Sequence, residues 1–412
     1  MADIRALYAD EDGNILDAPK GFQALARTGT DIIELSPDDL IPIPESADLM
    51  FLPDRLPLAK YGDEIMPIMG NAVAAILPAG YTRLYMPAFK KEDDAQMLPL
   101  YGYTAVVVYK DELYVAAMYT DENDKWDPAH YNTRNLHKLV KRVQKDLPDN
   151  RLVEHLGNCS LTWHCCTAQN LFYRRWEAGI PSSPVCNANC FGCISLQPAE
   201  CCPSPQSRIK FRPTPKEIAQ IGIYHLETAP DAIISFGQGC EGEPSLAVDN
   251  IVPAIEKIRK KTDKGQININ TNAGYTEGIK RIVDAGLDSM RVSIISAIPE
   301  NYKAYYRGSY ELDNVKESIR YAHEHGVHIS LNMLYFPGFN DSESEFKAWK
   351  EFLHEYPVHM IQIRNLNIDP DAFTEIMPPF TKAIGTKEFI RQLHEEFPDI
   401  VIGNFSHYQK GE

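Results

Sequence analysis

Long apolar runs and a secretory leader are both missing from this sequence. No segment approaches the roughly 18–20 continuous apolar residues that a membrane-spanning helix needs. The chain begins MADIRALYADEDG, with acids from Asp3 onward and no apolar run behind a basic start, unlike a signal peptide. We therefore expect a soluble, cytoplasmic protein with no membrane segment.

Basic residues are also scarce relative to acids. The 41 Lys and Arg stand against 57 Asp and Glu, which gives a formal net charge of −16. A non-specific nucleic-acid binder needs a basic surface to displace counterions from phosphates. The acidic balance therefore argues against DNA, RNA and anionic membranes as partners. The 412 residues, 44% hydrophobic and 24% charged, suit a globular protein of two or three domains.

Cysteine is absent before Cys159 and after Cys240, so all nine cysteines fall within one stretch. A disulfide framework suits a small secreted domain rather than a long chain without a leader. Clustered cysteines in a cytosolic protein indicate metal binding first.

Three regions follow one another along the chain. Residues 1–150 are expected to form a separate N-terminal α+β accessory domain, with hairpins near Asp12-Gly13 and over 103–120. Residues 151–212 are crowded with cysteine and proline, and we expect an irregular connecting region that a metal would order. Residues 213–412 alternate apolar strands with amphipathic helices, which predicts an α/β domain.

Six strands are expected in the third region. They are short and apolar, which is typical of a parallel sheet covered by helices, and they lie at 232–237, 267–270, 290–295, 328–334, 360–366 and 400–405. Right-handed crossovers would curl this sheet into a partial (β/α)6 TIM-like barrel. A site would then gather at the carboxyl ends of the strands.

Three cysteines carry the clearest motif. Cys186, Cys190 and Cys193 form C-x3-C-x2-C. Three thiolates on a short loop can hold three irons of a [4Fe–4S] cluster and leave the fourth iron open to a ligand. The alternative is a zinc loop, although zinc sites prefer C-x2-C pairs and four protein ligands. A turn, Gly242-Glu243-Pro244, follows the strand over 232–237.

The cysteine spacing and the G-E-P turn, in this order, resemble the radical S-adenosylmethionine (SAM) superfamily. The resemblance covers roughly residues 180–370. It implies that S-adenosyl-L-methionine chelates the open iron, and that reductive cleavage gives a 5′-deoxyadenosyl radical that abstracts hydrogen from a substrate. It also implies that Gly242, Glu243 and Pro244 bind the SAM amino group, and that strand-end residues contact the rest of SAM: Asn272, Ser293 and Asn332.

The substrate is left open by the sequence. A peptide, a cofactor precursor or a nucleoside all fit the resemblance, with flavodoxin or ferredoxin as the electron donor. A glycyl-radical activase acting on a partner protein is one alternative. A non-catalytic iron–sulfur or zinc protein is another, although a metal carrier has no use for the G-E-P turn.

The remaining cysteines suggest a second metal site. One residue from each adjacent pair, together with two single cysteines, would supply four ligands: Cys159, Cys165, Cys202 and Cys240. Buried free thiols are the alternative. Cys240 also lies inside the predicted SAM-binding turn, so it is a candidate catalytic residue that donates a hydrogen atom.

Overall fold

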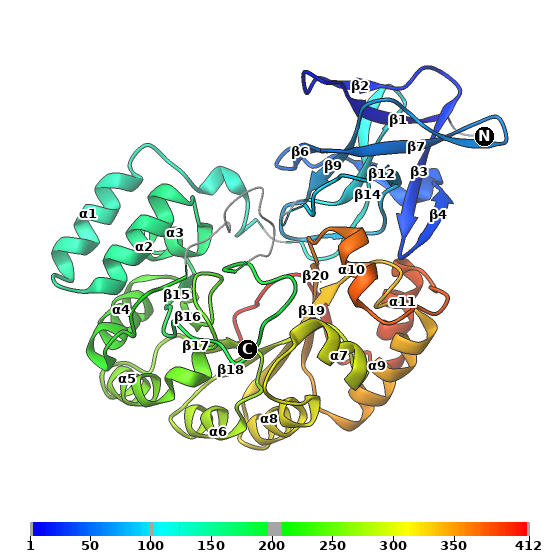
Figure 1. Ribbon diagram of the computed structural model, residues 1–412. Helices are drawn as coiled ribbons and strands as arrows, with labels where there is room; N and C mark the ends of the chain where they lie inside the picture. The colour runs from blue at the N-terminus through cyan, green and yellow to red at the C-terminus, as the bar shows by residue number, and fades with distance from the viewer. Residues whose placement is uncertain (1–2, 99, 101, 123, 197–207, 410–412) are drawn as a thin grey trace.

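The N-terminal part of the protein is an antiparallel β-structure (Figure 1). The computed structural model describes residues 3–98, 100, 102–122, 124–196 and 208–409. The strands of this part are β1 Ile4–Ala9, β2 Ile15–Asp17, β3 Phe22–Thr28, β4 Asp31–Glu34, β5 Leu40–Pro42, β6 Asp48–Leu52, β7 Arg55–Tyr61, β8 Glu64–Pro67, β9 Asn71–Ile76, β10 Tyr81–Arg83, β11 Met86–Pro87, β12 Phe89–Lys91, β13 Thr104–Tyr109 and β14 Glu112–Tyr119.

Both predicted hairpins are confirmed. Strands β1 and β2 pair around Gly13, whose φ of 81° suits the turn. Strands β13 and β14 pair across Lys110 and Asp111, both of which have positive φ, as a type I′ turn requires.

The helix predicted over 135–147 is present as α1, Leu136–Asp146, but it packs against α2, Arg151–Thr162, and α3, Cys166–Tyr173. The described part of residues 3–119 has strands and one short 3-10 helix, Pro37–Asp39. The helix that was predicted for the N-terminal α+β region thus packs against α2 and α3, which follow that region in the chain. The boundary at residue 150 stays a prediction.

The second sheet is parallel and has seven strands in chain order: β15 Glu177–Gly179, β16 Ile233–Phe236, β17 Gln266–Thr271, β18 Ser289–Ile294, β19 His328–Tyr335, β20 Met360–Asn365 and β21 Val401–Gly403. All six predicted strands are confirmed as β16 to β21. The sheet is not closed in the part of the chain that is described, because β15 and β21 are its two edges. The architecture is therefore an open α/β sheet, and closure into a barrel is not confirmed.

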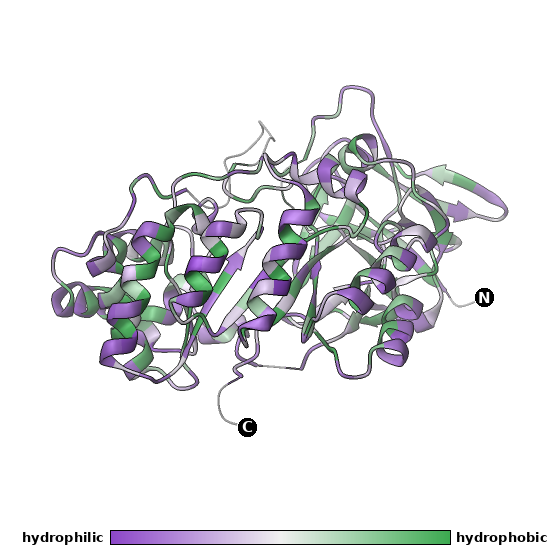
Figure 2. Ribbon diagram, turned by 90° about the horizontal axis from the view of Figure 1, so that it is seen from below, coloured by the Kyte–Doolittle hydropathy of each residue, from purple (hydrophilic) through white to green (hydrophobic). Residues whose placement is uncertain are grey.

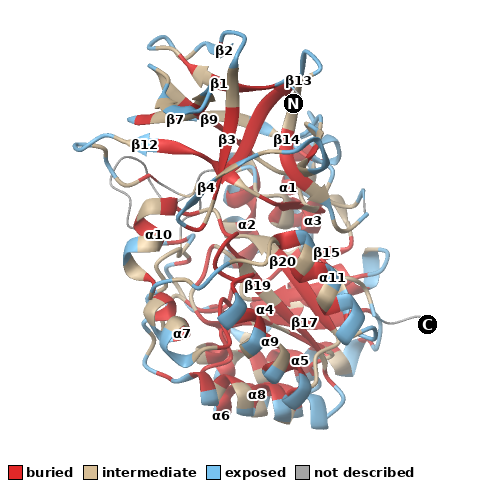
Figure 3. Cartoon of the chain, turned by 90° about the vertical axis from the view of Figure 1, so that its right-hand side faces the viewer, coloured by how far each residue is buried: buried red, intermediate tan, exposed pale blue. Residues whose placement is uncertain are grey.

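Helices cover this sheet (Figures 1 and 2). They are α4 Pro215–Thr228, α5 Val248–Lys261, α6 Thr276–Asp284, α7 Pro299–Tyr306, α8 Leu312–Glu324, α9 Glu343–Glu355, α10 Pro370–Ile376 and α11 Thr386–Glu396. Helix α4 begins as predicted: Thr214 caps it, Pro215 is its first residue, and Glu217 completes a capping box. The strands are buried and the outer faces of the helices are exposed (Figure 3), so one core lies between them.

The prediction of an irregular region over 151–212 is wrong for residues 151–179. Helices α2 and α3 and strand β15 lie there. Cysteine and proline suggested loops, but Leu152, Val153 and Leu156 form a buried helical face that packs into the common core. No helix among the described residues is long and apolar enough to cross a membrane.

Candidate functional site

The cysteine loop follows β15 and is held by the end of α7. The backbone N–H of Asn189 donates to the carbonyl oxygen of Tyr306 at 3.0 Å, and that of Phe191 donates to Tyr305 at 3.1 Å. The N–H of Cys193 closes a turn on the carbonyl oxygen of Cys190 at 3.2 Å. The loop is therefore fixed by main-chain bonds to a neighbouring helix, which the sequence did not indicate.

The three thiols lie half-buried and close enough to influence one another. Burial raises the pKa of Cys190, and the neighbouring Cys186 and Cys193 raise it further. Burial also raises the pKa of Cys186. Three neighbouring thiolates repel one another unless a cation lies among them. This donor set therefore fits the three protein ligands of a [4Fe–4S] cluster.

Two further side chains complete the surroundings of this loop. Arg208 lies with Nη2 3.6 Å from the sulfur of Cys193, so a positive charge faces one thiol. Tyr305 fills the space beside Gly192, since a Cβ added at Gly192 would lie 2.6 Å from the Tyr305 hydroxyl oxygen. Neither contact was predicted, because Arg208 and Tyr305 stand at no recognisable spacing from the cysteine motif.

The Gly242-Glu243-Pro244 turn pairs with the chain immediately before Cys186. The N–H of Gly242 donates to the carbonyl oxygen of Ser183 at 2.7 Å, and that of Glu243 donates to Val185 at 2.9 Å. A Cβ at Gly242 would come within 2.0 Å of the Val185 carbonyl oxygen, so only glycine fits. The two motifs that were 50 residues apart are thus joined by main-chain hydrogen bonds.

The Glu243 carboxylate is buried, and its oxygens are engaged within the protein. They accept hydrogen bonds from the Ser245 N–H at 3.0 Å, the Thr271 hydroxyl at 2.5 Å and the Asn272 N–H at 2.9 Å. Burial raises the pKa of Glu243, and these donors oppose the rise. The side chain therefore ties the end of β16 to the end of β17, and Pro244 begins the short 3-10 helix Pro244–Ala247.

A second buried carboxylate, Glu241, was missed by sequence reasoning. It accepts from the N–H groups of Ser182, Ser183, Gly237 and Gln238 at 2.7–2.9 Å. Burial raises the pKa of Glu241 to about 7, although the hydrogen bonds from these donors lower it. Glu241 fixes the chain before the cysteine loop to the turn after β16. An acid inside a glycine-rich turn was the only available sign.

The other predicted SAM contacts lie on, or just after, three neighbouring strands, with Ser293 near the end of β18 and Asn332 inside β19. Asn272, just after β17, donates from Nδ2 to Asn187 of the cysteine loop at 2.7 Å. Ser293 and Asn332 are paired across β18 and β19, with Asn332 Nδ2 donating to the Ser293 hydroxyl at 3.3 Å. Asn272 is thus linked to the cysteine loop, whereas Ser293 and Asn332 are linked to each other.

Residues 180–349 match the sequence profile of the Radical SAM superfamily. This segment is therefore similar to that superfamily. It contains the cysteine loop, the Gly242-Glu243-Pro244 turn and the strands from β16 to β19. The match confirms the resemblance inferred from the two motifs.

Curated relatives match about half of the chain. An uncharacterized protein of Methanocaldococcus jannaschii is 30% identical over 208 residues, covering 48% of this chain and 63% of its own. A GTP 3',8-cyclase of Lactiplantibacillus plantarum is 27% identical over 196 residues, covering 47% and 52%. The matched part of this chain therefore spans less than two thirds of either relative.

Solved structures are similar only at a low level. The crystal structure of a radical SAM methyltransferase from Sphaerobacter thermophilus has a TM-score of 0.40 at 14% identity, covering 81% of this chain and 78% of that one. This similarity is too low to support an argument about the activity.

Cys240 lies in the turn after β16, but its thiol is beside α2. The ligand atoms of Cys240, Cys159 and His155 all lie within 4.8 Å of one another. The Cys159 sulfur is 3.6 Å from His155 Nε2. A hydrogen bond from Cys240, and then His155, lower the pKa of Cys159 to about 5, whereas the same bond and burial raise that of Cys240.

Two of the four cysteines predicted for a second metal site are thus brought together, along with a histidine that was not predicted. Cys165 is near them: its N–H donates to the Cys159 carbonyl oxygen at 3.1 Å, and it adds to the electrostatic environment of Cys240. Cys202 lies outside the described residues. The spacing H-x3-C at 155–159, one turn of α2, was the sign that sequence reasoning overlooked.

Proposed function

We propose that this chain is a radical SAM enzyme that binds a [4Fe–4S] cluster through Cys186, Cys190 and Cys193 and abstracts hydrogen from an organic substrate. When bound, such a cluster supplies the electron that cleaves S-adenosyl-L-methionine. The observation that carries the proposal is the pairing of Gly242 and Glu243 with Ser183 and Val185. It puts the proposed SAM-binding turn next to the first cysteine.

The protein's own residues have defined tasks in this proposal. Glu243 holds the turn, so the main-chain carbonyl groups of residues 237–242 are the candidate acceptors for the SAM amino group. Asn272, Ser293 and Asn332 stay candidates for the carboxylate, ribose and adenine of SAM, because they lie on or just after neighbouring strands of the same sheet. A hydrogen-donating role for Cys240 is less well supported, because its thiol is with Cys159 and His155.

The experiment is electron paramagnetic resonance of anaerobically reconstituted, dithionite-reduced protein, with and without SAM. We expect a [4Fe–4S]⁺ signal that changes with SAM and is lost in Cys190→Ser. Cys166→Ser is the matched control, because Cys166 is a half-buried cysteine outside the loop and should leave the signal intact. A signal indifferent to SAM would instead indicate an electron carrier.

The substrate class follows as a separate question. Since relatives include a GTP 3',8-cyclase, a nucleotide is one candidate; a peptide or a cofactor precursor is another. Release of 5′-deoxyadenosine, with deuterium transferred from a labelled substrate, would identify the compound. Flavodoxin or ferredoxin is the proposed reductant.

We also propose a second metal site at Cys159, Cys240 and His155, with Cys165 or Cys202 as the fourth ligand. Two thiols and an imidazole within 4.8 Å of one another are typical donors for zinc or a single iron. Metal analysis should find one ion beyond the four cluster irons. It should be lost in Cys159→Ala and kept in Cys166→Ala; equal metal in both variants would contradict the site.

A further inference from the structure

The open edge of the parallel sheet is bridged by residues of the N-terminal part. Trp176, just before β15, and Phe405, just after β21, pack with Ile233, and Ala79 and Trp126 pack against this group. The two sheet edges that do not pair with each other are thus covered by an apolar plug. The plug therefore brings together Ala79, Trp126 and Phe405, which are far apart in the sequence.

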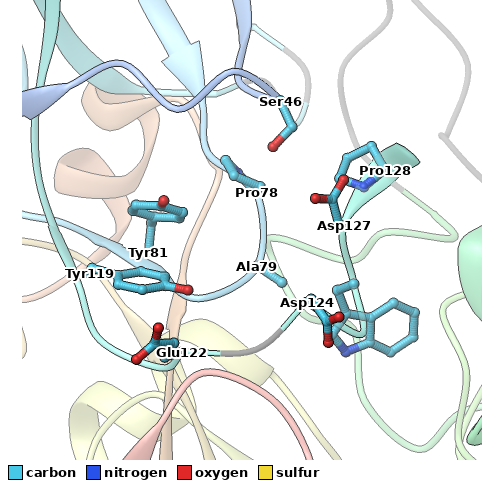
Figure 4. Close-up of a pocket in the computed structure, with 10 residues that line it drawn as sticks. Ser46, Pro78, Ala79, Tyr81, Tyr119, Glu122, Asp124, Asp127 and Pro128 are labelled. Atoms are coloured by element: carbon cyan, nitrogen blue, oxygen red, sulfur yellow. The ribbon is translucent and has the colours of Figure 1, made fainter. Parts of the chain in front are cut away.

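A cavity of about 520 Å³ opens beside this plug (Figure 4). Ala79 and Trp126 belong both to the plug and to the cavity wall. The volume falls in the range of small-ligand sites, roughly 300–1,000 Å³. Among the residues that the structure describes, neither the cysteines nor the predicted SAM contacts Asn272, Ser293 and Asn332 line it. The cavity is therefore distinct from the proposed SAM site.

Aromatic rings form one wall of this cavity. Tyr81 and Tyr119 are cross-strand partners on β10 and β14, and their ring centroids are 4.6 Å apart. In Figure 4 they lie together on one side, facing the segment that carries Asp124 and Asp127. Tyr119 is 47% exposed, and both tyrosines line the cavity.

Carboxylates supply the charge of the cavity, and no basic residue is among the described residues that line it. Glu122, Asp124 and Asp127 are the charged groups in its wall. The neighbouring cations are directed elsewhere: Lys125 Nζ lies over the Trp176 ring and 3.6 Å from Asp231, and Arg175 lies over Tyr131. The wall therefore combines negative charge with aromatic faces, the two features that attract an organic cation.

We propose that this cavity binds an organic cation, an ammonium or guanidinium group carried either by a free amine or by a basic side chain of a polypeptide. Aromatic faces attract such a group through the ring quadrupole, and carboxylates attract it by charge. The proposal does not depend on SAM chemistry, because it concerns a different cavity.

The test is equilibrium binding to the full-length, cluster-loaded protein, followed by tryptophan fluorescence. The probes are choline and its neutral isostere 3,3-dimethylbutan-1-ol. We expect choline to bind at least about tenfold more tightly, since the two differ mainly in charge. Equal binding of the two, or no binding of choline, would overturn the proposal.

Variants of residues that line the cavity test whether choline binds there. Tyr119→Ala and Glu122→Gln should each weaken choline binding about three- to tenfold, whereas Tyr119→Phe, which keeps the ring, should bind like the unaltered protein. Glu64→Gln, at an exposed acid of β8 outside the cavity, is the matched control and should also be unaffected. If Glu64→Gln weakens binding as much as Glu122→Gln, the attraction is only the overall negative charge, and the proposal fails.

Two further probes separate the sources of the cation. A capped Gly-Lys-Gly peptide is compared with butylamine, which carries the same ammonium group without a backbone. Tighter binding of the peptide identifies a polypeptide ligand, and equal binding identifies a free amine. Binding of neither overturns the proposal.

Discussion

At the residue scale, two buried carboxylates organise the proposed SAM site. Glu241 faces the chain before the cysteine loop, through Ser182 and Ser183. Glu243 faces β17, through Thr271 and Asn272. Buried carboxylates are costly unless several donors satisfy them, and here each has at least three. Their task is therefore to orient backbone segments around the site.

Glu243→Gln should separate this positioning role from a direct one. Glutamine keeps the shape but replaces one acceptor oxygen by an amide that must face a donor, either Thr271 or the Asn272 N–H. We expect unfolding free energy to fall by about 1–3 kcal/mol, together with a weaker effect of SAM on the reduced-cluster spectrum. Urea denaturation and electron paramagnetic resonance measure the two.

The matched control for that variant is Glu256→Gln. Glu256 is an exposed acid on α5, so its change should stay within about 0.5 kcal/mol. Equal stability of the two variants would show that the three hydrogen bonds of Glu243 contribute little.

Because His225 is buried, we expect the unfolding free energy of the protein to depend on pH. His225 is fully buried in α4, Nε2 donates to the Trp176 carbonyl oxygen at 3.0 Å, and burial lowers its pKa to about 4 from 6.5. The unfolded chain therefore takes up a proton below pH 6.5 while the folded protein does not. Stability from this group is complete above pH 6.5 and is lost as the pH falls toward 4.

Between pH 7 and pH 5 this loss should reach about 1–2 kcal/mol. His225→Gln, which keeps a donor for Trp176, should show a smaller fall in unfolding free energy over the same interval. His394→Gln, at an exposed position of α11, should retain the full fall. Parallel pH profiles for all three proteins would refute the assignment to His225.

At the element scale, the cysteine loop lies between two supports. The turn after β16 holds the chain before Cys186, and the carbonyl groups at the end of α7 hold the chain around Phe191. Main-chain hydrogen bonds to both elements fix the loop, so its shape depends on them. Changes outside the motif should therefore affect cluster binding.

Gly242→Ala tests the first support. The added Cβ would meet the Val185 carbonyl oxygen at 2.0 Å, and backbone on both sides leaves no flexible group to move. We expect iron content after reconstitution to fall by at least about half, with a loss of about 1–3 kcal/mol from strain. Gly157→Ala is the control, because its Cβ would meet only side-chain atoms, of Val140 at 3.1 Å and of Gln144 at 3.9 Å. Full iron content in Gly242→Ala would contradict the role of this pairing.

The strands of the sheet were predictable because periodicity and length agreed for each of them. Strands β16 to β21 are apolar and are separated by helices with clear ends, such as Thr214 and Pro215 at α4. Strand β15 was not predictable from the sequence. Its three residues, Glu-Ala-Gly, have no preference for a strand, and their conformation is fixed by pairing with β16.

The candidate site divides in the same way. The Cys186, Cys190 and Cys193 motif is local in sequence, so it could be recognised. His155 and Glu241 could not, because their roles arise from contacts between α2, β15 and the turn after β16 that only the folded chain creates.

At the scale of the whole molecule, buried arginines join the N-terminal β-structure to the parallel sheet. Arg55 pairs with Asp369 at 2.9 Å, with both side chains at most 1% exposed. Arg83 donates to Asn367 Oδ1 at 3.2 Å and to the Leu366 carbonyl oxygen at 2.8 Å. These partners follow β20, at the carboxyl edge of the sheet. The N-terminal part therefore rests on the edge where the site lies.

Arg55→Leu should show how strongly the two parts depend on each other. It would leave Asp369 buried without its cation, which costs about 3–5 kcal/mol of unfolding free energy. Arg281→Leu, which removes an exposed pair with Asp249, should cost less than about 1 kcal/mol. Chemical denaturation followed by both fluorescence and circular dichroism measures these values.

The double variant Arg55→Leu/Asp369→Leu distinguishes the ion pair from simple packing. Removing the stranded carboxylate should recover a large part of the loss, because the penalty of Arg55→Leu comes mainly from an unpaired buried charge. Asp369 also accepts from the Leu98 N–H and caps α10 through the Asp371 N–H, so recovery should be incomplete. If Arg55→Leu costs no more than Arg281→Leu, the N-terminal structure is only loosely joined to the sheet. In that case its contacts near Leu366 and Asn367 would not constrain the site.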